Sequence, residues 1–283
     1  MSGIAGDRDR RLTPANDCVA HESLRELVPA RRYTSGVWRQ LRVPLADLRL
    51  DPEGVRARQL LMGEAFLMLE RRGGRVFGQA ARDGHVGWLA AEALGEPDAP
   101  THWVSAPATH LYAAPEIRAP TLAGLSLGAR LHVEGQEGEM ARTARGAFVP
   151  GMHLRRIGDW ARDPVAVAES LIGTPYLWGG NSRGGLDCSA LVQMALLACG
   201  RPCPPDSDLQ QAGLGRALAP EEELRRGDLV FWRGHVGWMA DGADLLHANA
   251  HHMAVVREPL AGAAVRIAEG GGGAILARRR IDP

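Results

Sequence analysis

Apolar residues in the second half of the chain follow first a helical and then a strand period. Between Ser189 and Cys199 they fall at positions 191, 192, 195, 196 and 199, which is one face of a helix. Gly200 and Pro202 follow, and both residue types end helices. Short apolar runs at 227–232, 234–240 and 245–250 come next, the last two separated by the turn signal Asp241-Gly242. The stretches 257–265 and 274–279 are expected to add the last strands. The pattern predicts a helix followed by an antiparallel sheet, which is an α+β domain.

An earlier helix is predicted to begin at Asp163, because Asp is a good N-cap and Pro164 suits the first turn. Gly173 ends it. The next segment, 174–180, contains aromatic residues and glycines. This composition favours an irregular segment that forms the wall of a cleft, where the backbone must come close to another group. An ordinary loop with a buried Tyr and Trp is the alternative.

The first half of the chain predicts short strands and turns. Strand signals at ten-residue spacing in 55–95 indicate a small β-barrel, and 101–156 repeats the pattern more loosely. Before them we expect a short helix at Asp17–Leu27 and an extended stretch at Tyr33–Val43 in an arm that packs on later domains. The predicted organisation is an arm (1–54), two barrels (55–98 and 99–157) and the α+β domain (158–283).

Composition excludes several classes of function. The 283 residues carry 33 Arg and 33 Asp or Glu, so there is no net charge to attract nucleic acid. No run of 18 apolar residues predicts a membrane span. The polar stretch 1–11 lacks the apolar core of a signal peptide, so we expect a cytoplasmic protein. Four cysteines are too few for a disulfide framework; Cys199 and Cys203 could pair, but reduced thiols are favoured.

Cys188 is the candidate nucleophile. It stands where the predicted helix begins, and there unpaired backbone N–H groups and the helix dipole favour an anion. A thiol in that position is expected to have a pKa below its ordinary value. The alternative is a buried cysteine that only packs, as expected for Cys199.

A thiol nucleophile needs a base, and the base needs an orienting partner. His235 and His247 flank the Asp241-Gly242 turn. A three-residue loop, 241–243, pairs residue 240 with 244 and puts both imidazoles diagonally on one face, whereas a loop of two or four residues separates them. Each histidine alone could be structural. His247 and His251 are four apart, but no Cys-x-x-Cys or His-Glu-x-x-His pattern supports a metal site.

Five segments occur in an order that resembles the NlpC-type cysteine peptidases, bacterial cell-wall enzymes of the papain-like group. They are Pro175-Tyr176-Leu177-Trp178-Gly179-Gly180, Leu186-Asp187-Cys188-Ser189-Ala190-Leu191-Val192, Arg226-Gly227-Asp228-Leu229-Val230-Phe231-Trp232, Gly234-His235-Val236-Gly237 and Leu246-His247-Ala248. The resemblance covers about 163–283. Ala190 stands where the family usually has Gly, and we expect no loss of function from this good helix former.

The resemblance implies a papain-like fold and no cofactor. Cys188 would be the nucleophile, His235 the general base and then acid, and His247 the group that orients His235. The scissile bond would join γ-D-glutamate to a diamino acid of peptidoglycan stem peptides. Tyr176 lies where the family has a tyrosine beside the nucleophile; we expect its hydroxyl and the Cys188 backbone N–H to stabilise the oxyanion. A core tyrosine is the alternative.

The first barrel also carries a resemblance. The order Gly63-Glu64, an apolar strand, a glycine turn, a second strand and Asp83-Gly84-His85-Val86-Gly87-Trp88-Leu89 is similar to bacterial SH3-like domains. The second barrel resembles them by spacing only. Such barrels bind peptides or wall polymers, or brace a neighbouring domain.

Two such barrels before the peptidase domain resemble enzymes that recycle free murein peptides. In those enzymes an acidic residue of the first barrel and the Asp and Ser beside the cysteine bind the α-amine of L-alanine. Here the matching residues are Asp187, Ser189 and Glu64, although Glu64 could be a solvated turn residue. Further candidates for the substrate pocket are Trp178, Trp103, Asp206 and Ser207.

We therefore expect a cysteine endopeptidase that acts on a small murein peptide, as a monomer or weak oligomer without nucleic-acid or membrane partners. An amidase or acyltransferase on the same fold is one alternative. A non-catalytic wall-binding protein is another, which the combined Cys188, His235 and His247 disfavour.

Overall fold

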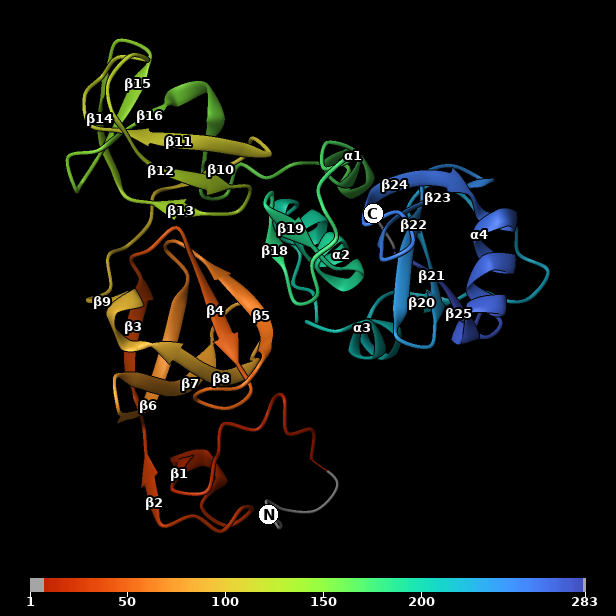
Figure 1. Cartoon of the computed structure of the whole chain (residues 1–283), viewed down its shortest axis with the longest axis horizontal. Helices are drawn as coiled ribbons and strands as arrows, with labels where there is room; N and C mark the ends of the chain where they lie inside the picture. The colour runs from red at the N-terminus through yellow and green to blue at the C-terminus, as the bar shows by residue number, and fades with distance from the viewer. Residues whose placement is uncertain (1–7, 282–283) are drawn as a thin grey trace. The chain divides into compact units, whose positions relative to one another are not determined.

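The computed structural model describes residues 8–281, in two compact units (Figure 1). The first unit holds the described residues up to Val104 together with Ala108–Arg156, and the second holds Ser105–Pro107 and the residues from Ile157 onward. Residues 1–7, part of the segment on which the expectation about a signal peptide rests, lie outside the described range. Within that range no helix has the length and apolar character that crossing a bilayer requires.

A seven-stranded sheet forms the first module of unit 1. Its order is β5-β4-β8-β7-β6-β3-β9, and the apolar side chains of Leu41, Leu48, Leu60 and Phe66 are fully buried in its core. The strands are β3 (Val37–Leu41), β4 (Leu45–Arg49), β5 (Arg56–Leu61), β6 (Ala65–Arg72), β7 (Arg75–Ala80), β8 (Val86–Ala90) and, after the turn η2 (Ala91–Ala93), β9 (Leu94–Gly95). The module thus begins before residue 55, because β3 and β4, which we had assigned to the arm, pair with β6 and β5.

The helix expected at Asp17–Leu27 does not form. The chain instead makes β1 (Val19–His21), the short 3-10 turn η1 (Glu22–Leu24) and β2 (Arg32–Thr34), with β1 and β2 parallel. The side chain of Asn16 accepts hydrogen bonds from the backbone N–H groups of Cys18 and Val19. Such a local turn competes with a helix, and the burial of Val19 stabilises the strand.

The second module of unit 1 is also built from short strands, ordered β12-β11-β16-β15-β14 in one sheet and β13-β10-β17 in another. They are β10 (His102–Val104), β11 (Ala108–Tyr112), β12 (Thr121–Ser126), β13 (Arg130–Leu131), β14 (Val133–Glu137), β15 (Met140–Thr143), β16 (Phe148–Pro150) and, after η3 (Gly151–His153), β17 (Leu154–Arg156). Leu61 of the first module packs in the core of the second, beside Val104 and Val149. Its kinship with SH3-like domains stays a prediction.

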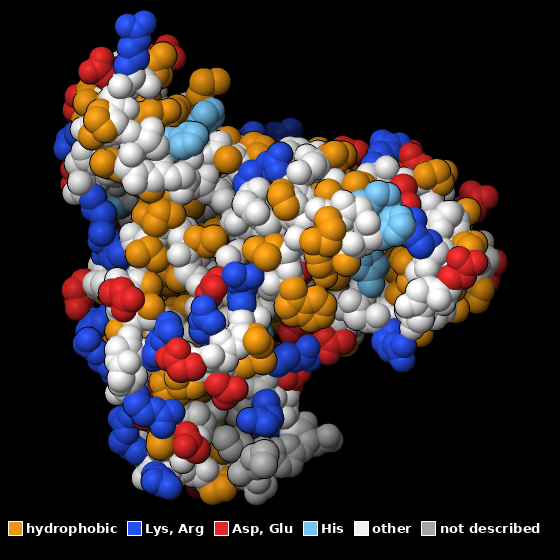
Figure 2. Space-filling model, viewed as in Figure 1, with side chains coloured by type: hydrophobic (Ala, Val, Ile, Leu, Met, Phe, Trp, Pro, Cys, Tyr) orange, Lys and Arg blue, Asp and Glu red, His pale blue; other side chains and the backbone are white. Residues whose placement is uncertain are grey.

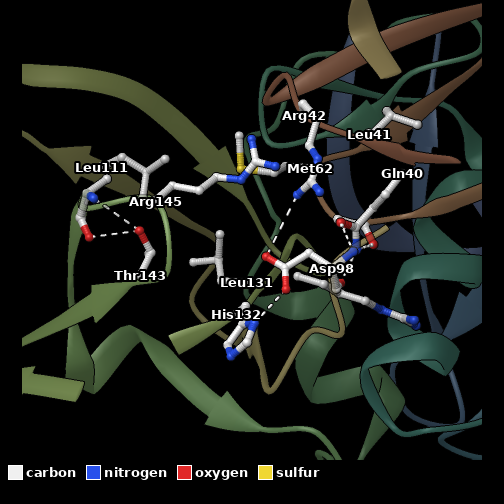
Figure 3. Close-up of a pocket in the computed structure, with 13 residues that line it drawn as sticks. Gln40, Leu41, Arg42, Met62, Asp98, Leu111, Leu131, His132, Thr143 and Arg145 are labelled. Carbon is white, nitrogen blue, oxygen red and sulfur yellow. Dashed lines mark hydrogen bonds and ion pairs between the residues drawn. The ribbon is translucent and has the colours of Figure 1, made fainter. Parts of the chain in front are cut away.

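A pocket lies between the two modules (Figure 3). Its charged lining includes Arg42, Asp98, His132 and Arg145. Figure 3 shows the Asp98 carboxylate between His132 and Arg42, 2.5 Å from His132 Nδ1 and 3.9 Å from the Arg42 guanidinium. The pocket contains none of the predicted catalytic side chains. On the face drawn in Figure 2, arginine and acidic side chains are interspersed.

Unit 2 has the predicted α+β architecture, with an antiparallel sheet ordered β20-β25-β21-β22-β23-β24. Figure 1 shows α2 and α4 on opposite sides of this sheet. The elements are α1 (Pro164–Glu169), β18 (Asn181–Ser182), β19 (Gly185–Leu186), α2 (Cys188–Ala198), α3 (Ser207–Gly213), β20 (Arg216–Ala217), β21 (Asp228–Trp232), β22 (His235–Met239), β23 (Asp244–Asn249), β24 (Ala254–Pro259), α4 (Leu260–Ile267), η4 (Ala268–Gly272) and β25 (Ala277–Arg280).

The stretch 257–265, expected to be a strand, changes structure at Pro259. β24 ends there and α4 begins at Leu260. Proline lacks the N–H that would continue the ladder, and the alanine-rich segment after it favours a helix. Ala263 of α4 is buried against Val230, Met239 and Leu245 of the sheet.

Candidate active site

Asp187 caps α2 and so places Cys188 at the first helical position. Its carboxylate accepts hydrogen bonds from the backbone N–H groups of Ala190 (2.7 Å) and Gly179 (3.0 Å) and from the Ser189 hydroxyl (2.9 Å). Such a cap stabilises a helix by about 1 kcal/mol. In this structure the carboxylate of Asp187 and the hydroxyl of Ser189 therefore have a capping role.

The thiol of Cys188 contacts the backbone on both sides of His235. Its Sγ lies 3.9 Å from the carbonyl oxygen of Gly234 and accepts a hydrogen bond from the backbone N–H of Val236. Strands β22 and β23 pair at Trp238↔Leu246 and Met239↔Leu245 but not beyond Trp238 toward His235. The sulfur therefore lies beside β22 at the end where the two strands separate.

The turn between β22 and β23 has the predicted three-residue length. The N–H of Ala240 donates to the carbonyl of Asp244, so 241–243 form the loop. His235 and His247 then lie on one face, with Nε2 of the first 2.7 Å from Nδ1 of the second and ring centroids 5.0 Å apart. The side chain of His247 is fully buried. The diagonal pairing of these imidazoles, derived from the loop length, is confirmed.

The hydrogen-bonded chain continues through two residues that the sequence pattern did not indicate. Glu258 Oε1 lies 2.7 Å from Nε2 of His247, and the guanidinium of Arg266 binds both oxygens of Glu258 at 2.7 and 2.5 Å. Glu258 is opposite Leu245 in the β23–β24 ladder and so diagonal to His247. Extending the strand register past the 250–253 turn could have found it.

The comparisons with known proteins agree with this geometry. A model of the NlpC/P60 family matches residues 173–266, and a model of the bacterial dipeptidyl-peptidase SH3 domain matches 48–94. A Bacillus subtilis gamma-D-glutamyl-L-lysine dipeptidyl-peptidase is 28% identical over 225 residues, which are 71% of this chain and 75% of that protein. One from Bacillus cereus is 24% identical, covering 84% and 76%.

A solved NlpC/P60 family protein from Bacillus cereus has the same fold. It superposes with a TM-score of 0.74 at 20% identity, covering 87% of this chain and all of that one. The chain carries an NlpC/P60 cysteine peptidase domain. It is a hydrolase with a papain-like fold, and an SH3 domain precedes the peptidase domain. The matched range includes Cys188, both histidines, Glu258 and Arg266.

Burial controls the protonation of the nucleophile in the NlpC/P60 domain. Cys188 is only 7% exposed, and burial, followed by the negative charge of Asp187, raises the pKa of its thiol to about 12. The N–H groups of Val236, Ser189 and Cys188 act in the opposite direction but are weaker. Our expectation of a lowered thiol pKa was therefore wrong, because desolvation outweighs the helix N-terminus.

The two histidines are neutral in the same environment. Burial, with smaller effects from His247 and Arg266, lowers the pKa of His235 to about 3. Burial also lowers the pKa of His247, against the opposing effect of Glu258. Near neutral pH the site therefore contains a neutral thiol and neutral imidazoles.

Tyr176 lies in an irregular segment that backbone hydrogen bonds hold in place. Its N–H donates to the carbonyl of Met253 (2.9 Å), and the next N–H, of Leu177, donates to Leu186 (3.0 Å). Burial, then the charges of Cys188 and Asp187, raise the pKa of the Tyr176 hydroxyl. The hydroxyl is thus protonated and able to donate a hydrogen bond, and it is close enough to Cys188 for the charge of the thiolate to affect its pKa. Trp178, two residues on, is 72% exposed.

Of the remaining predicted substrate residues, Glu64 and Trp103 belong to unit 1, and Asp206 and Ser207 belong to unit 2. Glu64 is only 6% exposed and is paired with Arg82 at 2.8 Å, so it is not a solvated turn residue. Trp103 is 3% exposed, the environment of a core side chain. Asp206 and Ser207 are half-buried at the start of α3, which packs on α2.

Proposed function

We propose that the NlpC/P60 domain hydrolyses the bond between γ-D-glutamate and a diamino acid in small murein peptides with a free N-terminal L-alanine. The observation that carries the proposal is the thiol of Cys188 against the backbone on both sides of His235, whose ring is hydrogen-bonded to His247. The names of the two Bacillus peptidases support the choice of bond. Recycling of cell-wall peptides is the role that such a substrate favours.

The reaction starts with transfer of the thiol proton to His235. Nε2 of this ring is bonded to His247, so Nδ1 is the nitrogen left to accept a proton from Cys188. The sulfur attacks the γ-carbonyl carbon, and the carbon–nitrogen bond breaks as His235 returns the proton to the leaving amine. A water molecule then gives a proton to His235 and attacks the thioester carbon. The carbon–sulfur bond breaks, the peptide leaves with a free γ-carboxyl group, and His235 returns the proton to the sulfur.

The oxyanion formed in each step needs hydrogen-bond donors. The Cys188 N–H is the first of α2 and donates to no acceptor oxygen within the described residues. The protonated hydroxyl of Tyr176 is the second donor. Each such donor contributes about 2.7–4 kcal/mol to transition-state stability.

Recognition of the free amine is assigned to carboxylates. The Asp187 carboxylate and the Ser189 hydroxyl flank Cys188 and are hydrogen-bonded to each other. The exposed Trp178 precedes Gly179, whose N–H donates to Asp187. Glu64 remains a candidate only if its ion pair with Arg82 is exchanged for the ammonium of the substrate. An ammonium that leaves water needs such a partner.

The test is cleavage of L-Ala-γ-D-Glu-L-Lys and of its diaminopimelate analogue, each with a free or an acetylated N-terminus. We expect cleavage of the free peptides, loss of activity in Cys188→Ala, and full activity in the control Cys199→Ala. Equal cleavage of acetylated peptides removes the amine anchor but leaves the peptidase. Failure to cleave any of them, with transfer of the acyl group to an added amine, indicates an acyltransferase instead.

A further inference from the structure

Glu258 and Arg266 stand at the end of the hydrogen-bonded chain that starts at His235. The carboxylate is fixed by a two-point ion pair with Arg266 of α4, and its Oε1 reaches Nε2 of the fully buried His247. Burial alone would raise the pKa of Glu258, but hydrogen bonds from Arg266 and His247 lower it to about 2. Glu258 is therefore an anion, which can only accept hydrogen bonds.

An anion at Nε2 determines where each imidazole carries its proton. His247 must hold its proton on Nε2 to donate to Glu258, which leaves Nδ1 as an acceptor. The 2.7 Å contact then requires His235 to donate from its own Nε2. Nδ1 of His235 is left with a lone pair, which is what a general base needs.

Asn249 opposes this arrangement. Its Nδ2 lies 3.0 Å from the same Nε2 of His247. The orientation of the amide is fixed, because its Oδ1 accepts from the backbone N–H of His252 at 2.8 Å. An amide donor at Nε2 favours the tautomer of His247 that has its proton on Nδ1. His235 would then accept at Nε2 and carry its own proton on Nδ1, so both rings would have the opposite tautomer. The charged contact of Glu258 is shorter, and charge-assisted hydrogen bonds are about twice as strong as neutral ones.

We propose that Glu258, held by Arg266, is a positioning residue that keeps His247 and His235 in the tautomers needed for proton abstraction, against the competing donor of Asn249. The groups facing this carboxylate are His247 from β23, Arg266 from α4, and His252 from the turn, whose Nδ1 is 3.8 Å away. This role rests on the proposed function only for its effect on rate, because the tautomers exist without substrate.

The direct test is nitrogen NMR of the imidazole rings in the wild type, Glu258→Gln and Glu258→Asp, with Glu221→Gln as a control. Glu221 is an exposed carboxylate outside the site. We expect the wild type, Glu258→Asp and the control to protonate His247 on Nε2, and Glu258→Gln to protonate it on Nδ1. A wild-type His247 protonated on Nδ1, or unchanged rings in Glu258→Gln, overturns the proposal.

The kinetic test uses a competing pair of substitutions. In serine proteases the wrong histidine tautomer lowers kcat about 10⁴-fold, so we expect a loss of about 10³- to 10⁴-fold in Glu258→Ala. Asn249→Ala added to Glu258→Ala removes the opposing donor and should recover at least tenfold in kcat. A purely structural role predicts that the double variant is no better than Glu258→Ala, and that result refutes the proposal.

The outcomes separate this inference from the proposed function. Tautomer reversal in a protein that cleaves no murein peptide supports the positioning role and rejects the function. Cleavage of the peptides by the wild type, with an unchanged kcat in a folded Glu258→Gln, supports the proposed function and rejects the positioning role. Circular dichroism and thermal melting check that each variant is folded. If the glutamine variant is not folded, the protonated nitrogen of His247 in the wild type still decides the test.

Discussion

Gly237 offers a way to move an imidazole without altering any group that takes part in the chemistry. It lies on β22 beside His247, and a Cβ added there would be 3.0 Å from the His247 Cβ and 2.7 Å from Leu245 Cδ1. Ordinary contacts of this kind begin at 3.4 Å. In Gly237→Ala, therefore, Leu245 rotates away and His247 moves by about 0.4 Å.

Misplacing a catalytic group by about 1 Å costs roughly 10²-fold in rate, so a shift of about 0.4 Å predicts a loss of about sixfold, or about 1 kcal/mol. We expect this loss in kcat with little change in KM, and an overpacking cost of about 1–3 kcal/mol in unfolding free energy. The assays are steady-state cleavage of the free tripeptide and urea unfolding.

The matched control is Gly262→Ala in α4, where an added Cβ meets no atom within 4 Å. We expect unchanged kcat and a gain of about 0.5–1 kcal/mol in stability from helix propensity. If Gly237→Ala is destabilised but keeps wild-type kcat, Leu245 has absorbed the whole strain and the geometric sensitivity inferred for His247 is wrong.

Four further outcomes follow from the site and its sheet. Tyr176→Phe should lower kcat by about 10²- to 10³-fold with little change in KM, and an unchanged kcat excludes its hydroxyl from oxyanion binding. Because burial raises the pKa of Cys188 to about 12, the rate of its alkylation by iodoacetamide should increase with pH up to strongly alkaline solution. A rate that is already constant from weakly acidic pH upward indicates a preformed thiolate and contradicts the raised pKa. Asp228 is fully buried and accepts two 2.8 Å hydrogen bonds from Arg280. Asp228→Asn should therefore lower the unfolding free energy measured by chemical denaturation by about 3–5 kcal/mol, and a loss under about 1 kcal/mol contradicts this. The pKa of Glu258 is lowered from 4.5 to about 2, so the stability that its carboxylate contributes to the fold is complete above pH 4.5 and is lost as the pH falls toward about 2. The unfolding free energies of the wild type and Glu258→Gln should therefore converge in acid. A constant difference between them at every pH refutes the lowered pKa.

Local patterns predicted the arrangement of the two imidazoles because register depends on loop length. Once Asp241-Gly242-Ala243 was taken as the turn, the alternation of a strand left one face for both His235 and His247. Asp163 and Pro164 likewise begin α1 as predicted, with the carboxylate of Asp163 accepting from the N–H groups of Val165 and Ala166. These features depend on residues close in sequence.

Features that depend on the surrounding protein were not predictable in the same way. Cys188 does lie at a helix N-terminus, but only the folded structure shows the burial that raises the pKa of its thiol. Glu258 stands in an apolar stretch whose change from strand to helix at Pro259 the hydrophobic pattern did not reveal. The ion pair of Glu64 with Arg82 joins residues 18 apart, and neither local sequence pattern predicts it.

The spacing of the proposed site residues along the chain has a practical consequence. His235, His247, Glu258 and Arg266 follow one another on β22, β23, β24 and α4, whereas Cys188 precedes them by more than forty residues. The intervening stretch 218–227 is mostly accessible. A break there divides the enzyme into one fragment with the sulfur and one with the complete proton relay. Neither fragment could act alone, so the domain suits a split reporter in which hydrolysis returns only when two fused partners bring the fragments together.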